Sequence, residues 1–182
     1  MCSSVVRSVV YCFVGMFAGL ALVGCGGPKL KAGEREQLPI PMEITVGAQA
    51  DVNPAADGRP SPVFVRVFEL ANDSRFQSAD YSELIRQDSV TLEGDVLSSE
   101  ERSLIPGEGW VVRKRASLQT KFLGVAAGYR DTNSIWRAVT PMPEPYLAGR
   151  LWTKSVSPTM RLYVRLDGSG VTLFREEELP KK

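Results

Sequence analysis

The sequence predicts a mainly β fold, a two-sheet β-sandwich with one or two short inserted helices. Apolar and polar residues alternate with period two over residues 42–48, the pattern of a half-buried strand. Further short apolar segments follow, and turns rich in Gly, Pro and Asp separate them. Helical spacing of apolar residues is concentrated in one stretch, residues 73–87. Short strands with turn signals between them are typical of a sandwich.

The N-terminal residues 1–24 have the features of a secretory signal peptide. Arg7 precedes an apolar run over residues 9–21, and small residues lead up to Cys25. The run is shorter than the roughly 20 residues that span a bilayer, although an uncleaved membrane helix is the alternative. Leu-Val-Gly-Cys at 22–25 resembles the bacterial lipobox, in which the cysteine sulfur receives a diacylglyceryl group. We therefore expect lipidation at Cys25, which would become the first residue of the mature chain.

Composition changes divide the chain into four expected regions. Residues 1–24 form the lipoprotein signal peptide, and residues 25–41, rich in Gly, Pro and charge, form the lipidated N-terminus and a flexible tether. Residues 42–175 form the β-sandwich domain, and residues 176–182 form a charged C-terminal tail. Without residues 1–24 the chain of 182 residues keeps 158, about the size of one domain.

The composition excludes several classes of function. Loss of residues 1–24 would leave 21 basic and 21 acidic residues, so no basic excess indicates a nucleic-acid partner. Cys2 and Cys12 would leave with the signal peptide, Cys25 would carry the lipid, and the chain has no histidine. Disulfides, thiolate nucleophiles, Ser-His-Asp triads and His-ligated zinc are therefore not expected. We expect no catalytic residue, no metal site and no cofactor, apart from the covalent diacylglycerol and N-acyl chain on Cys25.

The first two expected strands differ in how they are covered. In residues 42–48, Ile44, Val46 and Ala48 alternate with polar or small residues. Residues 63–70 carry three valines on one face and Phe64, Arg66, Phe68 and Leu70 on the other, so this strand should be covered on both sides. A turn-rich loop with Pro54, Gly58 and Pro60 joins the two strands at residues 51–61 and should project into solvent.

Residues 73–87 are the main helical candidate. Asp80 and Glu83 have the spacing of a capping box, in which the Asp80 side chain would accept a first-turn N–H. Tyr81, Leu84 and Ile85 then share one face, which should dock the helix onto the sheet.

The rest of the chain returns to β patterns. Strands are expected over residues 110–115, 122–129 and 135–139, and a closing hairpin over residues 162–174. Residues 122–129 are almost wholly apolar, as in a central strand. Gly124, Ala126 and Gly128 share one face of that strand, where a bulky group could approach closely.

An ordered set of motifs resembles a known family. The set comprises VRVFEL at 65–70, Phe76, ADY at 79–81, Leu84, PGE at 106–108, LGVAAGYRD at 123–131 and WRAV at 136–139. With the lipobox, it is similar to the type VI secretion lipoprotein family, TssJ or VasD/Lip. The resemblance implies a transthyretin-like β-sandwich with an added helical element, no enzymatic activity and a lipid anchor in the outer membrane, facing the periplasm. It also implies binding to the periplasmic C-terminal region of TssM (IcmF-like), with TssL as an indirect partner.

Two segments are candidate partner-binding surfaces. The resemblance implies that the loop at 51–61 occupies the place of a TssM contact of the family, without assigning a role to any single residue. A Pro-rich segment at 141–152 contains aromatic residues, which are common interface anchors. The candidate partner-binding residues are Asp51, Val52, Asn53, Pro54, Asp57, Gly58, Arg59, Tyr146 and Trp152. Glu69 stands where the family usually has an amide, so its role stays open.

Two other functions remain alternatives at this point. A carboxylate-based cell-wall hydrolase could use Glu100 with Glu101, or Glu69 with Asp131, because paired acids can cleave glycosides. An unrelated lipoprotein could bind a small ligand or another envelope protein, such as a pilus subunit, through a cavity or an unpaired sheet edge. Arg66, Arg130 and Arg137 are expected inside apolar strands, where they should pair with carboxylates or lie across the sheet.

Overall fold

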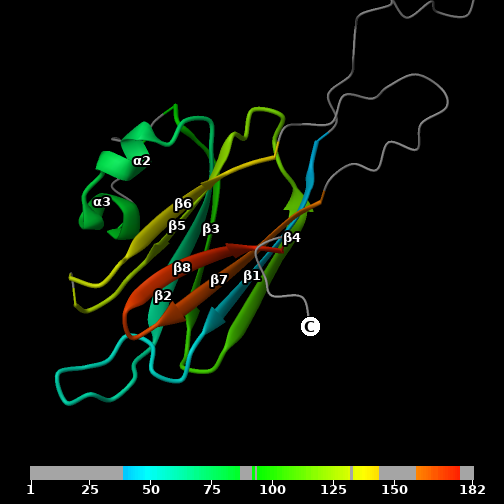
Figure 1. The fold of residues 1–182 in the computed structure, drawn as a ribbon. Helices are drawn as coiled ribbons and strands as arrows, with labels where there is room; N and C mark the ends of the chain where they lie inside the picture. The colour runs from blue at the N-terminus through cyan, green and yellow to red at the C-terminus, as the bar shows by residue number, and fades with distance from the viewer. Residues whose placement is uncertain (1–38, 87–91, 93, 132, 144–158, 177–182) are drawn as a thin grey trace, which may run out of the picture. The chain divides into compact units, whose positions relative to one another are not determined.

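Two four-stranded sheets face each other in the computed structural model, which describes residues 39–86, 92, 94–131, 133–143 and 159–176 (Figure 1). The predicted signal peptide, Cys25 and most of the tether lie outside the described residues, as do Tyr146, Trp152 and residues 177–182. The elements described all belong to one compact unit, residues 35–182. None of the helices in the described ranges is long and apolar enough to cross a membrane.

The first sheet has the strand order β4-β1-β7-β8. Its strands are β1 (Pro41–Ala48), β4 (Gly109–Arg115), β7 (Met160–Asp167) and β8 (Gly170–Arg175). β1 pairs antiparallel with β4 and parallel with β7. The predicted alternation of β1 is confirmed, because Met42, Ile44, Val46 and Ala48 are buried while the residues between them are partly exposed. β7 and β8 form the predicted closing hairpin.

The second sheet has the strand order β3-β2-β5-β6. Its strands are β2 (Val63–Leu70), β3 (Val96–Leu104), β5 (Phe122–Ala127) and β6 (Arg137–Pro141). Every β2 residue except Phe64 is buried, so the prediction that this strand is covered on both sides is confirmed. β5 is central, as predicted, and lies between β2 and β6. The strand predicted at 135–139 begins later, at Arg137, and Ile135 instead forms an isolated bridge with Gly170.

Two short helices replace the single helical stretch expected at 73–87. α2 (Ser74–Ser78) ends at Ala79, whose extended backbone separates it from α3 (Tyr81–Arg86). The predicted capping pair is formed in the reciprocal sense: the backbone N–H of Asp80 donates to Glu83 Oε2 at 2.6 Å. The fold class predicted from the sequence, a two-sheet sandwich with short inserted helices, is confirmed.

The second sheet is the middle layer of the described structure. Its inner face packs on the first sheet through the main hydrophobic core. Its outer face packs on the helices, with Phe76 and Leu84 against Phe68, Leu70 and Ala126. Gly124 was predicted to allow a bulky group to approach the strand closely, and this is confirmed. A Cβ at Gly124 would lie 2.8 Å from Phe76 Cζ. Phe76 therefore occupies the space that Gly124 leaves open.

The strand directions give the sandwich two distinct ends. At one end, which we name the tether end, β1 begins at Pro41, β4 ends at Arg115 and β8 ends at Arg175. At the other, the distal end, lie the segments 49–62, 105–108, 128–136 and 168–169. Figure 1 shows this separation, with the blue start of β1 at one end and the cyan loop after it at the other. A single strand, β1, thus connects the tether end with the loop at 51–61.

Candidate partner-binding loop and inter-sheet ion pairs

The loop at 51–61 is anchored in the core at both of its ends. Val52 is 0% and Asn53 3% exposed, and Ser61 is buried as well. Only the middle of the loop projects into solvent, so the expectation that the whole segment does so was wrong. Val52 and Asn53 were candidate partner-binding residues, but their side chains are buried in the protein. The apolar Val52 belongs to the core, and the amide of Asn53 bonds to the backbone, so both residues fix the loop to the sandwich.

Asn53 holds the two sides of the loop together. Its Nδ2 donates to the carbonyl of Pro62 at 2.6 Å, and its Oδ1 accepts the backbone N–H of Arg130 at 2.8 Å. Its φ of 49° lies in the left-handed region, which asparagine tolerates better than most residues. The start of the loop is therefore tied both to its end and to the neighbouring loop at 128–136.

The exposed tip has an ordered backbone of its own. Ala55 N–H donates to the carbonyl of Arg59, and Gly58 N–H donates to the carbonyl of Ala55, both at 2.8 Å. Gly58 has a φ of 77°, which favours glycine because a Cβ would be strained there. Asp57 and Arg59 form an exposed ion pair at 3.5 Å. The tip thus presents one acidic and one basic side chain on a hydrogen-bonded turn, beside the exposed Asp51 and Pro54.

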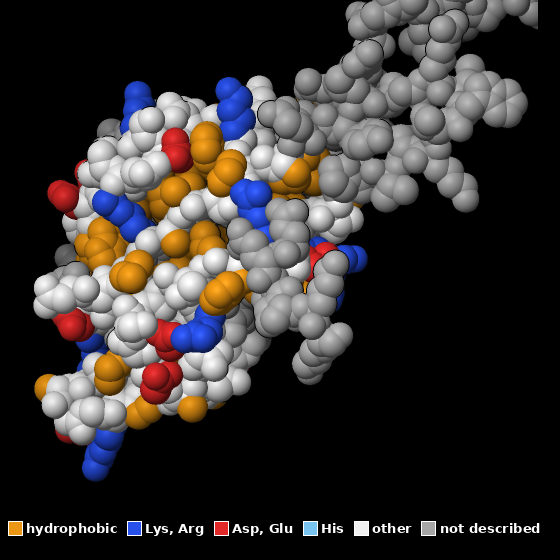
Figure 2. Space-filling model, in the orientation of Figure 1, with side chains coloured by type: hydrophobic (Ala, Val, Ile, Leu, Met, Phe, Trp, Pro, Cys, Tyr) orange, Lys and Arg blue, Asp and Glu red, His pale blue; other side chains and the backbone are white. Residues whose placement is uncertain are grey.

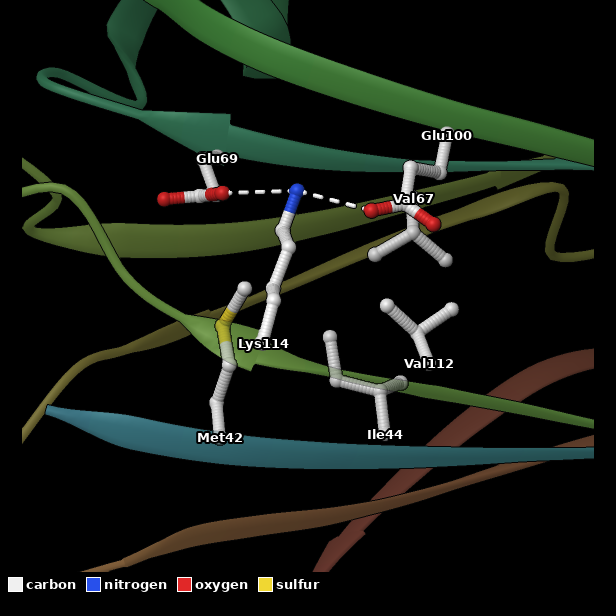
Figure 3. Close-up of a pocket in the computed structure, with 7 residues that line it drawn as sticks. All are labelled: Met42, Ile44, Val67, Glu69, Glu100, Val112 and Lys114. Atoms are coloured by element: carbon white, nitrogen blue, oxygen red, sulfur yellow. Dashed lines mark ion pairs between the residues drawn. The ribbon is translucent and has the colours of Figure 1, made fainter.

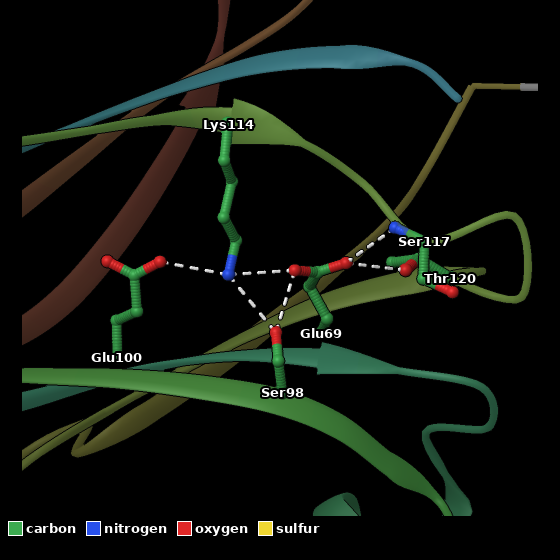
Figure 4. A network of polar contacts seen from close by, with 6 residues as sticks. All are labelled: Glu69, Ser98, Glu100, Lys114, Ser117 and Thr120. Carbon is green, nitrogen blue, oxygen red and sulfur yellow. Dashed lines mark hydrogen bonds and ion pairs between the residues drawn. The ribbon is translucent and has the colours of Figure 1, made fainter. Parts of the chain in front are cut away.

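A second polar cluster joins the two sheets near the tether end (Figure 4). Lys114 of β4 pairs with Glu69 of β2 at 2.8 Å and with Glu100 of β3 at 2.9 Å. The Glu69 carboxylate also accepts hydrogen bonds from Ser98 Oγ, Thr120 Oγ1 and the backbone N–H of Ser117. Burial alone would raise the pKa of Glu69, but the hydrogen bond from Lys114, together with these three, outweighs it and lowers the pKa from its ordinary 4.5 to about 2. Glu69 is therefore ionised at neutral pH.

A narrow recess lies between the sheets beside this cluster (Figure 3). Its lining comprises Met42, Ile44, Val67, Glu69, Glu100, Val112 and Lys114. Figure 3 shows the Lys114 side chain crossing the recess toward the two carboxylates, and the space is too narrow for a water molecule. The recess does not support the ligand-binding alternative, because a ligand site needs an open cavity.

The chain matches the model of one protein family. That family is described as "Type VI secretion lipoprotein, VasD, EvfM, TssJ, VC_A0113", and it matches residues 41–168. The chain belongs to this family. The family is a structural lipoprotein component of the type VI secretion system, so the resemblance stated from the sequence is confirmed. The comparison with curated proteins gave no match.

Solved structures agree with the family. The T6SS lipoprotein TssJ1 from Pseudomonas aeruginosa is 29% identical with a TM-score of 0.66, covering 80% of this chain and 100% of that one. Serratia marcescens Lip, "a membrane bound component of the Type VI Secretion System", is 27% identical with a TM-score of 0.66, covering 76% and 99%. A chain of the structure "T6SS protein TssM C-terminal domain (869-1107) from EAEC" is 26% identical with a TM-score of 0.57, covering 74% and 97%.

In this type VI secretion lipoprotein the expected carboxylate pairing is confirmed for Arg66, whereas Arg137 bonds to backbone carbonyls. Arg66 is buried, pairs with Glu101 at 3.1 Å and donates to the carbonyl of Leu84. Arg137 donates to the carbonyls of Phe76 and Ala79, and its guanidinium lies 4.6 Å from the centre of the Trp136 ring. Both arginines fasten the helices to the second sheet. Arg130 is exposed at the distal end, so its expected place within a strand was wrong.

The carboxylate pairs of the hydrolase alternative are not assembled as acid–base pairs. Glu69 lies opposite Leu123 in the sheet register, whereas Asp131 follows β5 at the distal end. Glu100 and Glu101 are consecutive strand residues that pair with different cations, Lys114 and Arg66. Across the described ranges, no three His, Cys, Asp or Glu side chains are grouped to hold a metal ion.

Two features of this lipoprotein were not found from the sequence. The pairing of Glu69 with Lys114 joins residues of different sheets, and only the single acid within VRVFEL at 65–70 signalled it. The anchoring role of Asn53 had a weaker signal, an asparagine before Pro54 at the start of a loop. Cys25, Tyr146 and Trp152 lie outside the described residues, so the structure places none of them.

Proposed function

We propose that this lipoprotein is anchored in the outer membrane and binds the periplasmic C-terminal region of TssM, thereby linking the outer and inner membranes. The proposal includes removal of residues 1–24, lipidation of Cys25, and TssL as an indirect partner through TssM. One observation carries it: the loop at 51–61 lies at the end of the sandwich opposite the one where the chain from Cys25 enters. No reaction is assigned to the chain.

The length of the N-terminal segment suits this arrangement. Residues 26–41 separate Cys25 from the sandwich and would reach roughly 50 Å if fully extended, at about 3.3 Å each. The acyl chains supply the attachment, since two or more lipid chains give stable membrane anchoring. Confinement near the membrane then raises the effective concentration of the loop for a partner in the same envelope.

The shape of the loop suits a binding role. Its backbone is already hydrogen-bonded, so binding would order few additional residues and lose little conformational entropy. Its tip offers Asp57 and Arg59, charged groups that can fix the orientation of a partner. The family membership supports the choice of partner, as does the likeness to a chain of the TssM C-terminal domain structure.

The lipid anchor can be tested with Cys25→Ser. We expect the variant to fold but to be lost from the outer-membrane fraction, and mass spectrometry of the natural chain should find acyl mass on Cys25. Unchanged membrane association of the variant, or a mature N-terminus elsewhere, would contradict the anchor.

The loop can be tested by calorimetry with the periplasmic region of TssM. We expect Asp57→Lys combined with Arg59→Glu, which preserves net charge, to weaken binding at least tenfold. Glu43→Lys combined with Arg113→Glu is the matched control, because it reverses a surface ion pair on the first sheet and also preserves net charge. Tyr146→Ala and Trp152→Ala test the second proposed segment in the same assay. Unchanged affinity in the loop variant would remove the loop from the interface.

A further inference from the structure

We propose that the tether end rests on an anionic phospholipid surface through Arg115, Leu118 and Lys121, which orients the loop at 51–61 away from the membrane. This contact rests on the lipid anchor proposed above. The three residues lie on the turn between β4 and β5 or at its edges. The partner is the bilayer that holds the acyl chains, and the recognised groups are the phosphates of anionic lipids.

The turn lies directly beside the entry of the N-terminal segment. Pro41, the first residue of β1, pairs with Arg115, the last residue of β4. One residue earlier, the carbonyl of Ile40 accepts the backbone N–H of Ala116 at 2.9 Å. A chain leading from a lipidated Cys25 therefore enters the sandwich next to this turn, and its own backbone is bonded to it.

Two basic side chains at the tether end are available to a membrane, whereas three others there are paired with carboxylates. Arg113 pairs with Glu43, Arg161 pairs with Glu176, and Lys114 is occupied by the carboxylates between the sheets. Arg115 and Lys121 are exposed, and neither has a carboxylate partner among the residues that the structure describes. Two cations on this end are therefore available to lipid phosphates, which attract Lys and Arg near a membrane surface.

An exposed apolar residue, Leu118, lies between these two cations in the sequence. Leu118 lies in the turn and is 51% exposed, so its side chain is accessible to a membrane surface. A basic pair around an exposed leucine is a small version of the arrangement found in interfacial membrane contacts, where apolar groups enter the headgroup region and cations bind phosphates. On the face turned to the viewer, Figure 2 shows hydrophobic side chains interspersed with polar and charged ones.

The turn is held rigid by the buried carboxylate of Glu69. Glu69 Oε2 accepts the backbone N–H of Ser117 at 3.0 Å and the hydroxyl of Thr120 at 2.7 Å. Thr120 N–H also donates to the carbonyl of Ser117, and Lys121 N–H donates to the carbonyl of Leu70. Leu118 is thus presented on a fixed turn, so contact with lipid would orient the whole sandwich.

Three such residues bind too weakly to attach a free domain, but a tethered domain needs no independent affinity. The lipid anchor would keep the turn close to the bilayer at high effective concentration. Two cations and one leucine then suffice to favour one orientation over others. The loop at 51–61, at the opposite end, would face the periplasm.

A fluorophore at position 118 tests the contact in the lipidated, full mature protein. Leu118→Cys supplies a unique thiol, because the chain has no cysteine after the lipidated Cys25. Asp57→Cys, at the distal loop, is the matched control site. Each protein is labelled with an environment-sensitive probe and reconstituted in vesicles of phosphatidylethanolamine and phosphatidylglycerol that contain brominated lipid.

We expect bromine to quench the probe at 118 several-fold more than the probe at 57. Arg115→Glu with Lys121→Glu should abolish the difference, whereas Arg102→Glu with Arg130→Glu, an equal charge change at the distal end, should not. Replacing phosphatidylglycerol by phosphatidylcholine should reduce the difference in quenching between the two probe positions. On unlabelled protein, hydrogen exchange over residues 117–121 should slow several-fold on the anionic vesicles.

Vesicle flotation separates failure of this contact from failure of the anchor. A protein that floats with the vesicles but shows equal quenching at both sites, and no change in hydrogen exchange, contradicts the contact and leaves the anchor standing. A protein that does not float contradicts the anchor, and the contact with it.

Discussion

Lys114 Nζ lies 2.8 Å from Glu69 Oε1, and the two residues belong to different sheets of the sandwich. Glu69 is 5% exposed, so its charge is removed from water and depends on its partners. The same carboxylate fixes the turn between β4 and β5. On the opposite side of the sandwich Arg175 of β8 donates to Thr140 Oγ1 and to the carbonyl of Pro141. Polar groups therefore fasten both open sides of a mainly apolar core.

Removing the positive charge of Lys114 should destabilise the protein strongly. Lys114→Met keeps most of the apolar stem but leaves the buried Glu69 carboxylate without its charge partner. We expect the free energy of unfolding at pH 7 to fall by about 3 kcal/mol, the order found when one member of a buried pair is removed. Urea denaturation followed by circular dichroism measures this.

The double variant Glu69→Gln with Lys114→Met is the control for that result. It removes both charges, so it should be less destabilised than Lys114→Met alone. If the double variant loses as much as the two single variants together, the two residues are not coupled.

Acid should destabilise the protein in a defined pH window. Hydrogen bonds hold the pKa of Glu69 at about 2, and burial opposes them. For Asp167, burial likewise opposes the hydrogen bonds from Ser169 and Arg165, which lower its pKa from 3.8 to about 2. Because the folded-state pKa values are the lower ones, the unfolded chain takes up protons first as the pH falls. The stabilisation is therefore complete above about pH 4.5 and disappears as the pH falls toward 2.

For Glu69 this loss should amount to about 3 kcal/mol. The free energy of unfolding can be measured at pH 7, 5, 3 and 2 in the natural chain and in Glu69→Gln. The difference between the two proteins gives the contribution of Glu69 to the loss of stability in acid. The variant should show a clearly shallower decline, and parallel curves would mean that Glu69 is not responsible.

Gly124 should tolerate no side chain, whereas Gly128 in the same segment should. A Cβ at Gly124 would lie 2.8 Å from Phe76 Cζ, and Phe76 is only 1% exposed. Gly124→Ala should therefore lower the free energy of unfolding by about 1–3 kcal/mol through overpacking. A Cβ at Gly128 meets its nearest atom, Phe64 Cβ, at 3.4 Å, so Gly128→Ala should change stability by less. Thermal denaturation of the two variants under identical conditions gives the comparison.

Asn53 should determine the order of the loop at 51–61. Asn53→Ala removes the hydrogen bonds to Pro62 and Arg130 and places an alanine at positive φ, so we expect a loss of about 2–3 kcal/mol. Hydrogen exchange of residues 52–61 should accelerate. Asn53→Gly loses the same bonds without the backbone strain. Its stability and its hydrogen exchange should therefore lie between those of the natural chain and those of Asn53→Ala. Equal exchange in all three proteins would show that other contacts order the loop.

Much of the fold could be predicted from local patterns. The alternation in β1, the double-sided cover of β2 and the small residues of β5 each follow from the sequence, because each depends on neighbours two residues apart. The start of α3 follows from the capping pair Asp80 and Glu83, whereas the separate short helix α2 before it was not predicted.

The polar pairings were harder to predict because they depend on the sheet register. Arg66 lies opposite Glu101 across β2 and β3, and neither residue marks the other in the sequence. The loop at 51–61 was located by its Gly and Pro content, but the same composition hid the buried Val52 and Asn53. Composition predicts where a loop lies, whereas its anchoring depends on segments that are distant in the chain.

The position of β1 has a mechanical consequence. The strand begins at Pro41, on the side of the proposed lipid attachment, and ends at Ala48, just before the proposed partner loop. It is hydrogen-bonded along its length to β4 on one side and β7 on the other. Tension between two membranes would enter and leave the sandwich at the two ends of β1, so most of the load would pass along the covalent backbone of a strand that is already extended. The hydrogen bonds to the neighbouring strands would carry little of that load, and the rest of the sandwich should stay folded under a pull that would peel away an edge strand.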